Sequence, residues 1–226
     1  MEILFEDNHL IAVNKLASDI VQADKTGDLS LEEKVKSYIK EKYKKEGDAF
    51  LGVVHRIDRP VSGLVLFART SKSLSRLNEM FQNKEIKKTY WAIVKNLPSQ
   101  KSETLVHYLT RDSSKNKAYA FDKEVKDSKK ASLSYKVLFS SDNYHLLEID
   151  LHTGRHHQIR CQLAKIGCPI KGDLKYGFPR SNDDGGISLH SRSMEFAHPV
   201  KKDIVTITAI PPKDKLWDFF LEKIKD

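Results

Sequence analysis

Residues 55–63 of this 226-residue chain hold one aspartate between two arginines, directly before an apolar run. The segment reads HRIDRPVSG, and residues 64–68 that follow are all apolar. Positive charge within about 4 to 6 Å favours the ionised form of a carboxylate, so Asp58 is expected to be charged at neutral pH. An ionised aspartate can attack as a nucleophile or take up a proton, but it has no proton to donate.

The same nine residues also fit an ordinary solvated turn, because Asp, Pro, Ser and Gly are typical turn residues. A second segment, TGRHHQIR at residues 153–160, supplies groups that could complete a reactive site with Asp58. The two segments together point to chemistry far more specifically than either does alone.

Arg160 is the side chain in the second segment that best complements Asp58. If the apolar residues of the helix predicted here face the core, Arg160 lies about 100° around the helix from Ile159, at the border of the core. A bidentate bond to a carboxylate offsets the desolvation of a buried guanidinium, and we expect Asp58 to be that carboxylate. The alternative is a surface arginine whose stem lies along the helix.

The charge of the chain suits a polyanionic partner. Lys and Arg number 39 against 31 Asp and Glu, which gives a formal net charge of +8. Nucleic acid is the first candidate for such a partner, although a basic charge alone is equally compatible with a protein that binds none.

Cys161 and Cys168 are the only cysteines, too few for a disulfide framework and without the paired spacing of a zinc site. Reduced thiols and a cytoplasmic location are therefore expected. The N-terminal residues resemble no secretory signal, and no stretch approaches the roughly 20 apolar residues of a membrane span. We expect a soluble protein that does not bind membranes.

Apolar periodicity predicts alternating strands and helices. Strands are expected at residues 3–5, 10–13, 64–68, 89–94, 133–139, 144–151 and 203–210. Helices are expected from Ser30 with a capping box to Glu33, from Thr70 or Ser71 to Phe81, from a Thr153 cap to Ile166, and over residues 216–224.

Consecutive strands outnumber helices, which favours an α+β fold with a mainly antiparallel or mixed central sheet, helices packed on it and a central RNA-binding cleft. We expect a single domain over residues 1–226. Residues 111–130 are rich in charge and predict an exposed hairpin or mobile loop, either a phosphate contact or simply solvated. Gly172-Asp173 and Tyr176-Gly177 are interpreted as structural turns.

A cluster of histidines could suggest a metal site, but their spacing does not. They are expected on a strand, a turn and a helix start, without the HExxH pattern of a zinc site. The cluster comprises His145, His152, His156 and His157. We expect no bound metal.

In its motifs the chain resembles the RluA-type pseudouridine synthases, which isomerise uridine to pseudouridine in ribosomal and transfer RNA. The matching segments keep the family order over nearly the whole chain. They are HRID at 55–58 with Ser62-Gly63, KTYWA at 88–92, TGR at 153–155 with HQIR at 157–160, Gly172-Asp173 with Tyr176-Gly177, and Leu189-His190 with Phe196 and His198-Pro199.

The resemblance implies that Asp58 is the catalytic aspartate, that Arg160 forms its salt bridge, and that Tyr90 packs against the target base and takes part in the final proton removal. Arg56 resembles the arginine that enters the RNA where the base leaves. The resemblance also implies RNA-binding positions at His55, Arg59, Arg155, His157 and Gln158, the last two as scaffold of the cleft.

The chain departs from the family pattern at several positions. Ile57 stands where Leu is usual, Val61 where Thr is usual and His156 where Thr or Ser is usual, and Leu16 and Ser18 replace the Pro and Gly of a Lys-Pro-x-Gly motif that begins at Lys15. These changes bear on loop geometry or substrate choice, and none removes a group that the chemistry needs.

The implied reaction imports no group and oxidises nothing, so no cofactor is expected. The target uridine must leave its stem at a cost of a few kcal/mol, part of which stacking on Tyr90 can recover. We expect a monomer that acts on a ribosomal or transfer RNA stem-loop without an obligatory protein partner or an N-terminal S4 domain. The alternatives are a catalytically inactive RNA-binding protein on the same fold and a glycosidase that releases free uracil.

Overall fold

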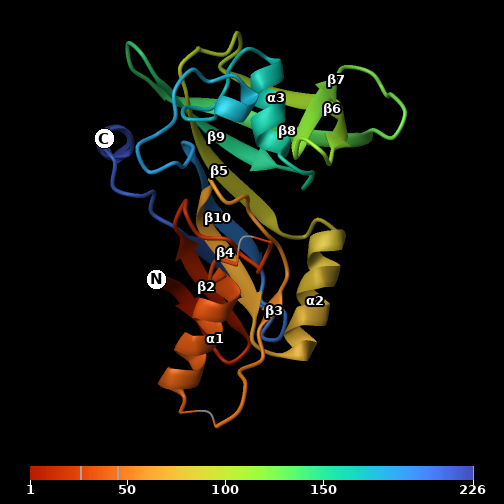
Figure 1. Cartoon of the computed structure of the whole chain (residues 1–226), viewed down its shortest axis with the longest axis vertical. Helices are drawn as coiled ribbons and strands as arrows, with labels where there is room; N and C mark the ends of the chain where they lie inside the picture. The colour runs from red at the N-terminus through yellow and green to blue at the C-terminus, as the bar shows by residue number, and fades with distance from the viewer. Residues whose placement is uncertain (26, 45, 226) are drawn as a thin grey trace. The chain divides into compact units, whose positions relative to one another are not determined.

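The computed structural model describes residues 1–25, 27–44 and 46–225, and it divides into two compact units. The first unit comprises Met1–Ile86 with Ser191–Ile210, and the second comprises Lys87–His190 with Pro211–Asp226. Helices flank a mixed sheet of mostly antiparallel strands, as the sequence predicted (Figure 1). No helix in the described part of the chain is long and apolar enough to cross a membrane.

The described residues of the first unit form six strands and two helices. They are β1 (Glu2–Glu6), β2 (Leu10–Lys15), α1 (Leu31–Lys42), β3 (Gly52–Val53), β4 (Ser62–Ala68), α2 (Ser71–Gln82), β10 (Leu189–Ala197, whose first two residues belong to the second unit) and β11 (Ile204–Thr208). The strand order is β1-β2-β4-β10, with β11 beside β10 and β3 beside β4.

Strand β4 is the centre of this unit, because all seven of its residues are buried. Its start requires glycine. Gly63 has a φ of +112°, and a Cβ there would lie 2.4 Å from the backbone oxygen of Ser191 in β10. The close approach of β4 to β10 therefore admits no side chain at position 63, and it fixes the strand that follows the Asp58 segment.

Helix α1 begins with the predicted capping box. The Glu33 backbone N–H donates to Ser30 Oγ at 3.3 Å, and the Ser30 backbone N–H donates to Glu33 Oε2 at 2.8 Å. Such a cap satisfies N–H groups that the first turn leaves without helical partners.

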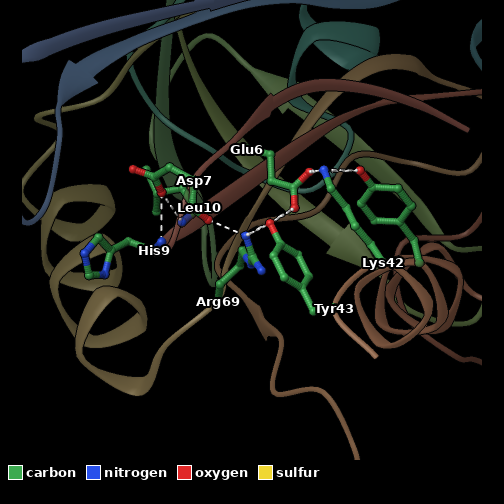
Figure 2. A network of polar contacts seen from close by, with 8 residues as sticks. Glu6, Asp7, His9, Leu10, Lys42, Tyr43 and Arg69 are labelled. Atoms are coloured by element: carbon green, nitrogen blue, oxygen red, sulfur yellow. Dashed lines mark hydrogen bonds and ion pairs between the residues drawn. The ribbon is translucent and has the colours of Figure 1, made fainter. Parts of the chain in front are cut away.

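A polar network ties the end of α1 to β1 and to the residue after β4 (Figure 2). Glu6 accepts hydrogen bonds from Lys42 Nζ at 2.6 Å and from Tyr43 Oη at 2.8 Å. Arg69 Nη1 donates to the Asp7 carbonyl and to Glu6 Oε1, and the distance to Glu6 Oε1 is 3.2 Å. The hydrogen bonds from Lys42 and the tyrosines outweigh burial, and they lower the pKa of Glu6.

The second unit has five antiparallel strands in the order β5-β9-β8-β6-β7. Its elements are β5 (Lys87–Val94), β6 (Ser102–Asp112), β7 (Lys117–Phe121), β8 (Lys129–Ser140), β9 (His145–Leu151), α3 (Gln158–Lys165), the 3-10 helix η1 (Leu174–Tyr176) and α4 (Lys215–Lys225). The hairpin predicted within residues 111–130 is confirmed as β6 and β7, and residues 122–128 form the loop that leads to β8.

Helices α3 and α4 cover opposite faces of this five-stranded sheet. Cys161 of α3 packs with Leu109 and Ala118, which point to one face. Trp217 and Phe220 of α4 pack with Trp91 and Ile93, whose side chains point to the other face. The sheet therefore has a helix on each side, but each helix covers only part of its face.

Candidate active site

Asp58 lies in the loop between β3 and β4, where its side chain is half-buried. The Val61 backbone N–H donates to the Asp58 carbonyl at 3.0 Å, the i to i+3 bond of a β-turn. The turn suggested by Asp, Pro and Ser is thus present, and it presents the carboxylate directly before the buried strand β4.

The two arginines that flank Asp58 are exposed and reach toward other residues. Arg59 Nη2 lies 2.6 Å from Asp28 Oδ2, and Arg56 Nη1 lies 3.5 Å from Gln22 Oε1. The expected role of both guanidinium groups in keeping Asp58 ionised stays a prediction.

Lys15 is a buried cation close to this loop that the sequence analysis did not single out. Its side chain has no exposed surface, and Nζ donates to the carbonyls of Leu16 at 2.8 Å, Asp19 at 2.8 Å and Arg59 at 3.0 Å. Only the protonated ammonium has three hydrogens, so three acceptors require the charged form. The Lys15 side chain thereby joins the end of β2 to the residue that follows Asp58.

Burial lowers the pKa of Lys15 to about 7, while the negative charges of Asp19 and Asp58 oppose that shift. Lysines are rarely buried, so composition and periodicity gave no reason to place this one in the core.

His55 anchors the other end of the loop. Its Nε2 accepts a hydrogen bond from the Leu66 backbone N–H at 2.9 Å, and its ring stacks on Phe81 with centroids 5.2 Å apart. A ring nitrogen that accepts from a backbone N–H is unprotonated, so this imidazole is neutral with its proton on Nδ1. The contact gives His55 a structural role, and its role in RNA binding stays a prediction.

Tyr90 lies in β5 of the second unit, where it is 7% exposed and stands opposite Ile149 of β9. The neighbouring Lys88 is half-buried, and burial lowers its pKa. A Cβ on Gly154 would lie 3.9 Å from Lys88 Nζ, so the KTY segment of β5 and the TGR segment before α3 are close together. The sequence indicated Lys88 only as part of the KTYWA motif, and its position near Gly154 adds it to the candidate site.

The start of α3 differs from the sequence prediction. Thr153 was expected to cap this helix, but α3 begins at Gln158 after His157, whose φ of 51° is left-handed. Thr153 Oγ1 instead donates to Gln158 Oε1 at 2.7 Å and accepts from the Ser132 backbone N–H at 2.9 Å. The predicted Thr153 cap is wrong because β8 uses this hydroxyl to hold the incoming loop.

Gln158 organises the same loop. Its Nε2 donates to the Ser132 carbonyl at 3.0 Å, and its Oε1 accepts from the Arg155 backbone N–H, also at 3.0 Å. Arg155 itself is exposed, and its Nε donates to the Lys130 carbonyl at 3.2 Å. Gln158 therefore has the contacts of a scaffold residue.

Arg160 is buried and bound to a carboxylate, so the alternative prediction, a surface arginine whose stem lies along the helix, is wrong. Its Nε lies 2.7 Å from Asp173 Oδ2 and its Nη2 lies 2.9 Å from Asp173 Oδ1, a bidentate pair in which both residues are less than 5% exposed. The Tyr176 ring lies beneath the guanidinium at 5.1 Å.

Asp173 was interpreted as a turn residue, and its side chain proves to be the carboxylate that binds Arg160 within the second unit. The sequence signal that could have revealed this contact is the conjunction of Gly172-Asp173 with a buried arginine 13 residues earlier. Asp58 and Arg160 belong to different units, and their predicted ion pair stays a prediction.

Tyr176 connects α3 to the edge strand β7. Its hydroxyl oxygen accepts from the Ala118 backbone N–H at 2.8 Å and lies 3.0 Å from His157 Nδ1. Burial raises the pKa of Tyr176, so the hydroxyl stays protonated. His156, a departure from the family pattern, stacks on His157 with ring centroids 3.8 Å apart and lies 3.1 Å from Asn116 Oδ1 through Nε2.

Among the described residues, no group of three His, Cys, Asp or Glu side chains is arranged to hold a metal ion. The expectation that the protein binds no metal and needs no cofactor stays a prediction.

Comparisons with known proteins agree with the motifs. The RNA pseudouridylate synthase family model matches residues 9–165. An RNA pseudouridine synthase of Zymomonas mobilis is 31% identical over 210 residues, which are 92% of this chain and 93% of the relative. A tRNA pseudouridine synthase C of Haemophilus influenzae is 29% identical over 227 residues, which are 92% of each chain.

Solved structures show the same fold. Human RNA pseudouridylate synthase domain containing 4 superposes with a TM-score of 0.78 at 21% identity, over 99% of this chain and 93% of the human one. Human RNA pseudouridylate synthase domain containing 1 superposes with a TM-score of 0.70 at 17% identity, over 99% of this chain and 94% of the human one.

The chain belongs to the RNA pseudouridylate synthase family. It is an isomerase that converts uridine to pseudouridine in RNA.

Proposed function

We propose that Asp58 is the residue that reacts with the ribose of the target uridine. The observation that carries this proposal is the way its loop is held. The loop is anchored on both sides of Asp58, at the Arg59 backbone carbonyl by the buried Lys15 and at the His55 side chain by the Leu66 backbone N–H of β4, while the carboxylate itself keeps partial exposure. A fixed loop that presents one reactive side chain is what precise positioning requires.

The reaction is balanced within the substrate. In one route the Asp58 carboxylate attacks C1′ and expels uracil through N1; the uracil turns, C5 attacks C1′ and displaces the carboxylate, and a proton moves from C5 to N1. In the other route the carboxylate removes a ribose proton as the N1–C1′ bond breaks, which gives a glycal and uracil; C5 then joins C1′, the same proton returns to the ribose, and the C5 proton moves to N1. Both routes need an ionised Asp58, and neither oxidises nor imports anything.

Arg160 and Tyr90 have supporting roles in this proposal. Arg160 is the cation that pairs with Asp58, and the bidentate contact with Asp173 supports a fixed orientation of its guanidinium. Tyr90 stacks on the flipped uracil and assists the loss of the C5 proton. Arg56, which is exposed, fills the space that the flipped base leaves in the RNA.

The remaining predicted RNA contacts divide by exposure. Arg59 and Arg155 are exposed and suit phosphate contacts, whereas His55 is half-buried and His157 and Gln158 are buried and suit a supporting role.

We propose transfer RNA as the substrate class, with ribosomal RNA as the alternative. Relatives named tRNA pseudouridine synthase C match this chain over 92% or more of both lengths, which supports the choice. Mapping pseudouridine across cellular RNA with and without this protein identifies the substrate.

The free, buried thiols of Cys161 and Cys168 suit a reducing compartment, and we propose that the enzyme acts in the cytoplasm as a monomer without an obligatory protein partner. Light scattering of the purified protein measures its oligomeric state.

The test of the catalytic proposal is tritium release from RNA labelled at uridine C5, with the wild-type protein and with Asp58→Asn. We expect the variant to bind RNA as the wild type does and to lose activity by about 10⁴-fold or more, as removal of an essential reacting group does. Asp28→Asn, which changes the partner of Arg59, is the matched control and should keep most activity. Comparable rates for Asp58→Asn and wild type would rule out the assignment.

A further inference from the structure

The face of the second unit's sheet opposite α3 carries an exposed row of aromatic and basic side chains. Residues opposite one another in antiparallel strands share a face, and Tyr108 of β6 stands opposite both Phe121 of β7 and Lys130 of β8. In the adjacent rows, Tyr119 stands opposite Thr110 and Val106 stands opposite Ser132. Tyr108, Tyr119 and Phe121 together form the aromatic row.

The aromatic row lies on the α4 side of the sheet but beyond the residues that α4 covers. Helix α4 packs on Trp91, Ile93 and Leu146 of β5 and β9 and on Phe139 near the end of β8, whereas Tyr108 stands opposite Lys130 at the start of that strand. Tyr119 is 37% exposed, Phe121 38% and Val106 44%. Large apolar side chains gathered on an open sheet face, in a protein with a well-filled core, mark an interaction surface.

Basic side chains border the aromatic row. Lys117 Nζ lies 5.7 Å from the centre of the Tyr119 ring and 5.2 Å from the centre of the Tyr176 ring, and Lys130 is exposed in the row of Tyr108 and Phe121. Two carboxylates lie near these lysines: Asp112 stands opposite Lys117 and accepts hydrogen bonds from Ser114 Oγ at 2.6 Å and the Lys115 backbone N–H at 3.0 Å, and Asp122 lies 3.0 Å from Lys165 Nζ. Hydroxyl groups continue the face beyond Val106, where Thr104 and Ser134 are hydrogen-bonded at 2.8 Å.

This combination fits single-stranded RNA. Bases stack on exposed aromatic rings, phosphates are attracted by lysines, and hydroxyl groups bond to ribose and phosphate oxygens. A second copy of this chain fits poorly, because each copy has a formal net charge of +8 and would bring lysines against lysines.

The aromatic row is separate from the candidate catalytic residues. Trp91 stands opposite Glu148, which stands opposite Lys136, and Lys136 stands opposite Ser102 of β6. Side chains alternate along a strand, so Ser102 and Tyr108 share the face of Trp91, whereas Tyr90 points to the other face with α3. RNA on the aromatic row is therefore on the opposite side of this sheet from Tyr90.

We propose that the aromatic row binds a single-stranded stretch of the substrate RNA, with bases stacked on Tyr119 and Phe121 and phosphates at Lys117 and Lys130. The proposal rests on the RNA substrate of the enzyme but not on the assignment of Asp58.

The test uses a 12-nucleotide oligouridylate with 5-iodouridine, which crosslinks on irradiation to the aromatic side chains that stack on it. Mass spectrometry of the crosslinked peptides should identify Tyr119 or Phe121. Crosslinks confined to Tyr90 or to other residues on the α3 face would overturn the proposal. Because the assay measures binding, an inactive Asp58→Asn protein gives the same result and separates this proposal from the catalytic one.

Affinity measurements with the same oligonucleotide provide the second test. We expect Tyr119→Ala and Phe121→Ala each to weaken binding by about tenfold, as loss of one stacking partner does. Lys130→Gln should lower the salt dependence of log K by roughly 0.7. Leu97→Ala, at a site 56% exposed in another loop of the same unit, is the control and should bind as the wild type does.

Thermal melting and light scattering complete the design. Variants of the aromatic row should melt within a few degrees of the wild type, because these side chains are exposed. Wild-type affinity in Tyr119→Ala/Phe121→Ala contradicts the proposal. A concentration-dependent dimer that the same substitutions dissociate also contradicts it, since the face would then bind a second copy.

Discussion

The Asp58 loop and the start of α3 hold their key side chains in opposite ways. Around Asp58, Lys15 Nζ binds the Arg59 backbone carbonyl, the His55 ring accepts a hydrogen bond from the Leu66 backbone N–H of β4, and the carboxylate keeps partial exposure. Around Arg160 the anchors act on the side chain, through Asp173 and the Tyr176 ring, and the guanidinium is buried. The loop contacts therefore hold Asp58 through its neighbours, whereas the contacts near α3 hold the Arg160 guanidinium directly.

The largest effect is expected from breaking the ion pair between Arg160 and Asp173. Asp173→Ala leaves the buried Arg160 guanidinium without this partner, and loss of one member of a buried ion pair costs about 3 to 5 kcal/mol of unfolding free energy. Urea denaturation measures the change.

The matched control for Asp173→Ala is the double variant Arg160→Met/Asp173→Leu. It removes both charges, so it should recover most of the stability while remaining inactive. A double variant no more stable than Asp173→Ala would show that the ion pair is not the source of the loss.

The sequence predicted several of the helices and strands around these two regions, but not the contacts that hold the side chains in place. The capping box at Ser30 and Glu33, the buried strand β4 and the burial of an apolar helix face near Ile159 followed from local rules, because each depends on neighbouring residues. Strand β10 was not predicted, since its buried His190 and Ser191 hide the alternation of apolar residues.

The supporting contacts of the site were also missed, for a common reason. Lys15 binds carbonyls up to 44 residues away, and Asp173 binds Arg160 across the α3 to η1 connection. Both residues belong to types that are usually exposed, and only the tertiary fold reveals that they are buried. Backbone carbonyls as ligands leave no trace in side-chain patterns.

The anchoring of the Asp58 loop is tested at Lys15. Lys15→Met removes the donor to the Leu16, Asp19 and Arg59 carbonyls and frees the loop after Asp58. We expect kcat to fall by about 100-fold with little change in KM, because misplacing a reacting group by about 1 Å costs that much. Steady-state kinetics of tritium release measure both constants.

Lys34→Met is the control for Lys15→Met. Lys34 Nζ binds Asp19 through its side chain at 2.6 Å but has no contact with the Arg59 carbonyl among its hydrogen bonds. It should lose about fivefold or less in kcat, because this partly exposed ion pair does not contact the Arg59 carbonyl and surface ion pairs contribute about 0.2 to 1 kcal/mol. An equal loss in both variants would mean that Asp19, rather than the Arg59 backbone, governs the Asp58 loop.

A smaller effect is expected at Tyr176. Tyr176→Phe leaves the buried Ala118 N–H without its acceptor and removes the contact with His157, at a cost of about 1 to 3 kcal/mol. Hydrogen exchange at Ala118 should accelerate, while exchange in α1 of the first unit should not change. Unchanged exchange at Ala118 would show that Tyr176 does not hold β7 to α3.

The smallest effect is expected from pH, and it has opposite signs for stability and activity. Burial lowers the pKa of Lys15 from its ordinary value of 10.5 to about 7, while Asp19 and Asp58 raise it and Arg59 lowers it further. Between these two values the unfolded chain binds the proton that the folded chain has lost. The contribution of Lys15 to the unfolding free energy therefore rises with pH in this window, and it is least favourable below pH 7.

Activity should move the other way, because a neutral amine has two hydrogens for three carbonyls. Loss of one such bond is worth roughly 0.5 to 1.5 kcal/mol, so kcat should fall by about twofold to tenfold between pH 6.5 and 8.5. Lys15→Met should flatten both profiles over this range. A wild-type kcat with the same pH dependence as that of Lys15→Met would show that deprotonation of Lys15 leaves the Asp58 loop in place, and that this loop does not depend on the third carbonyl contact.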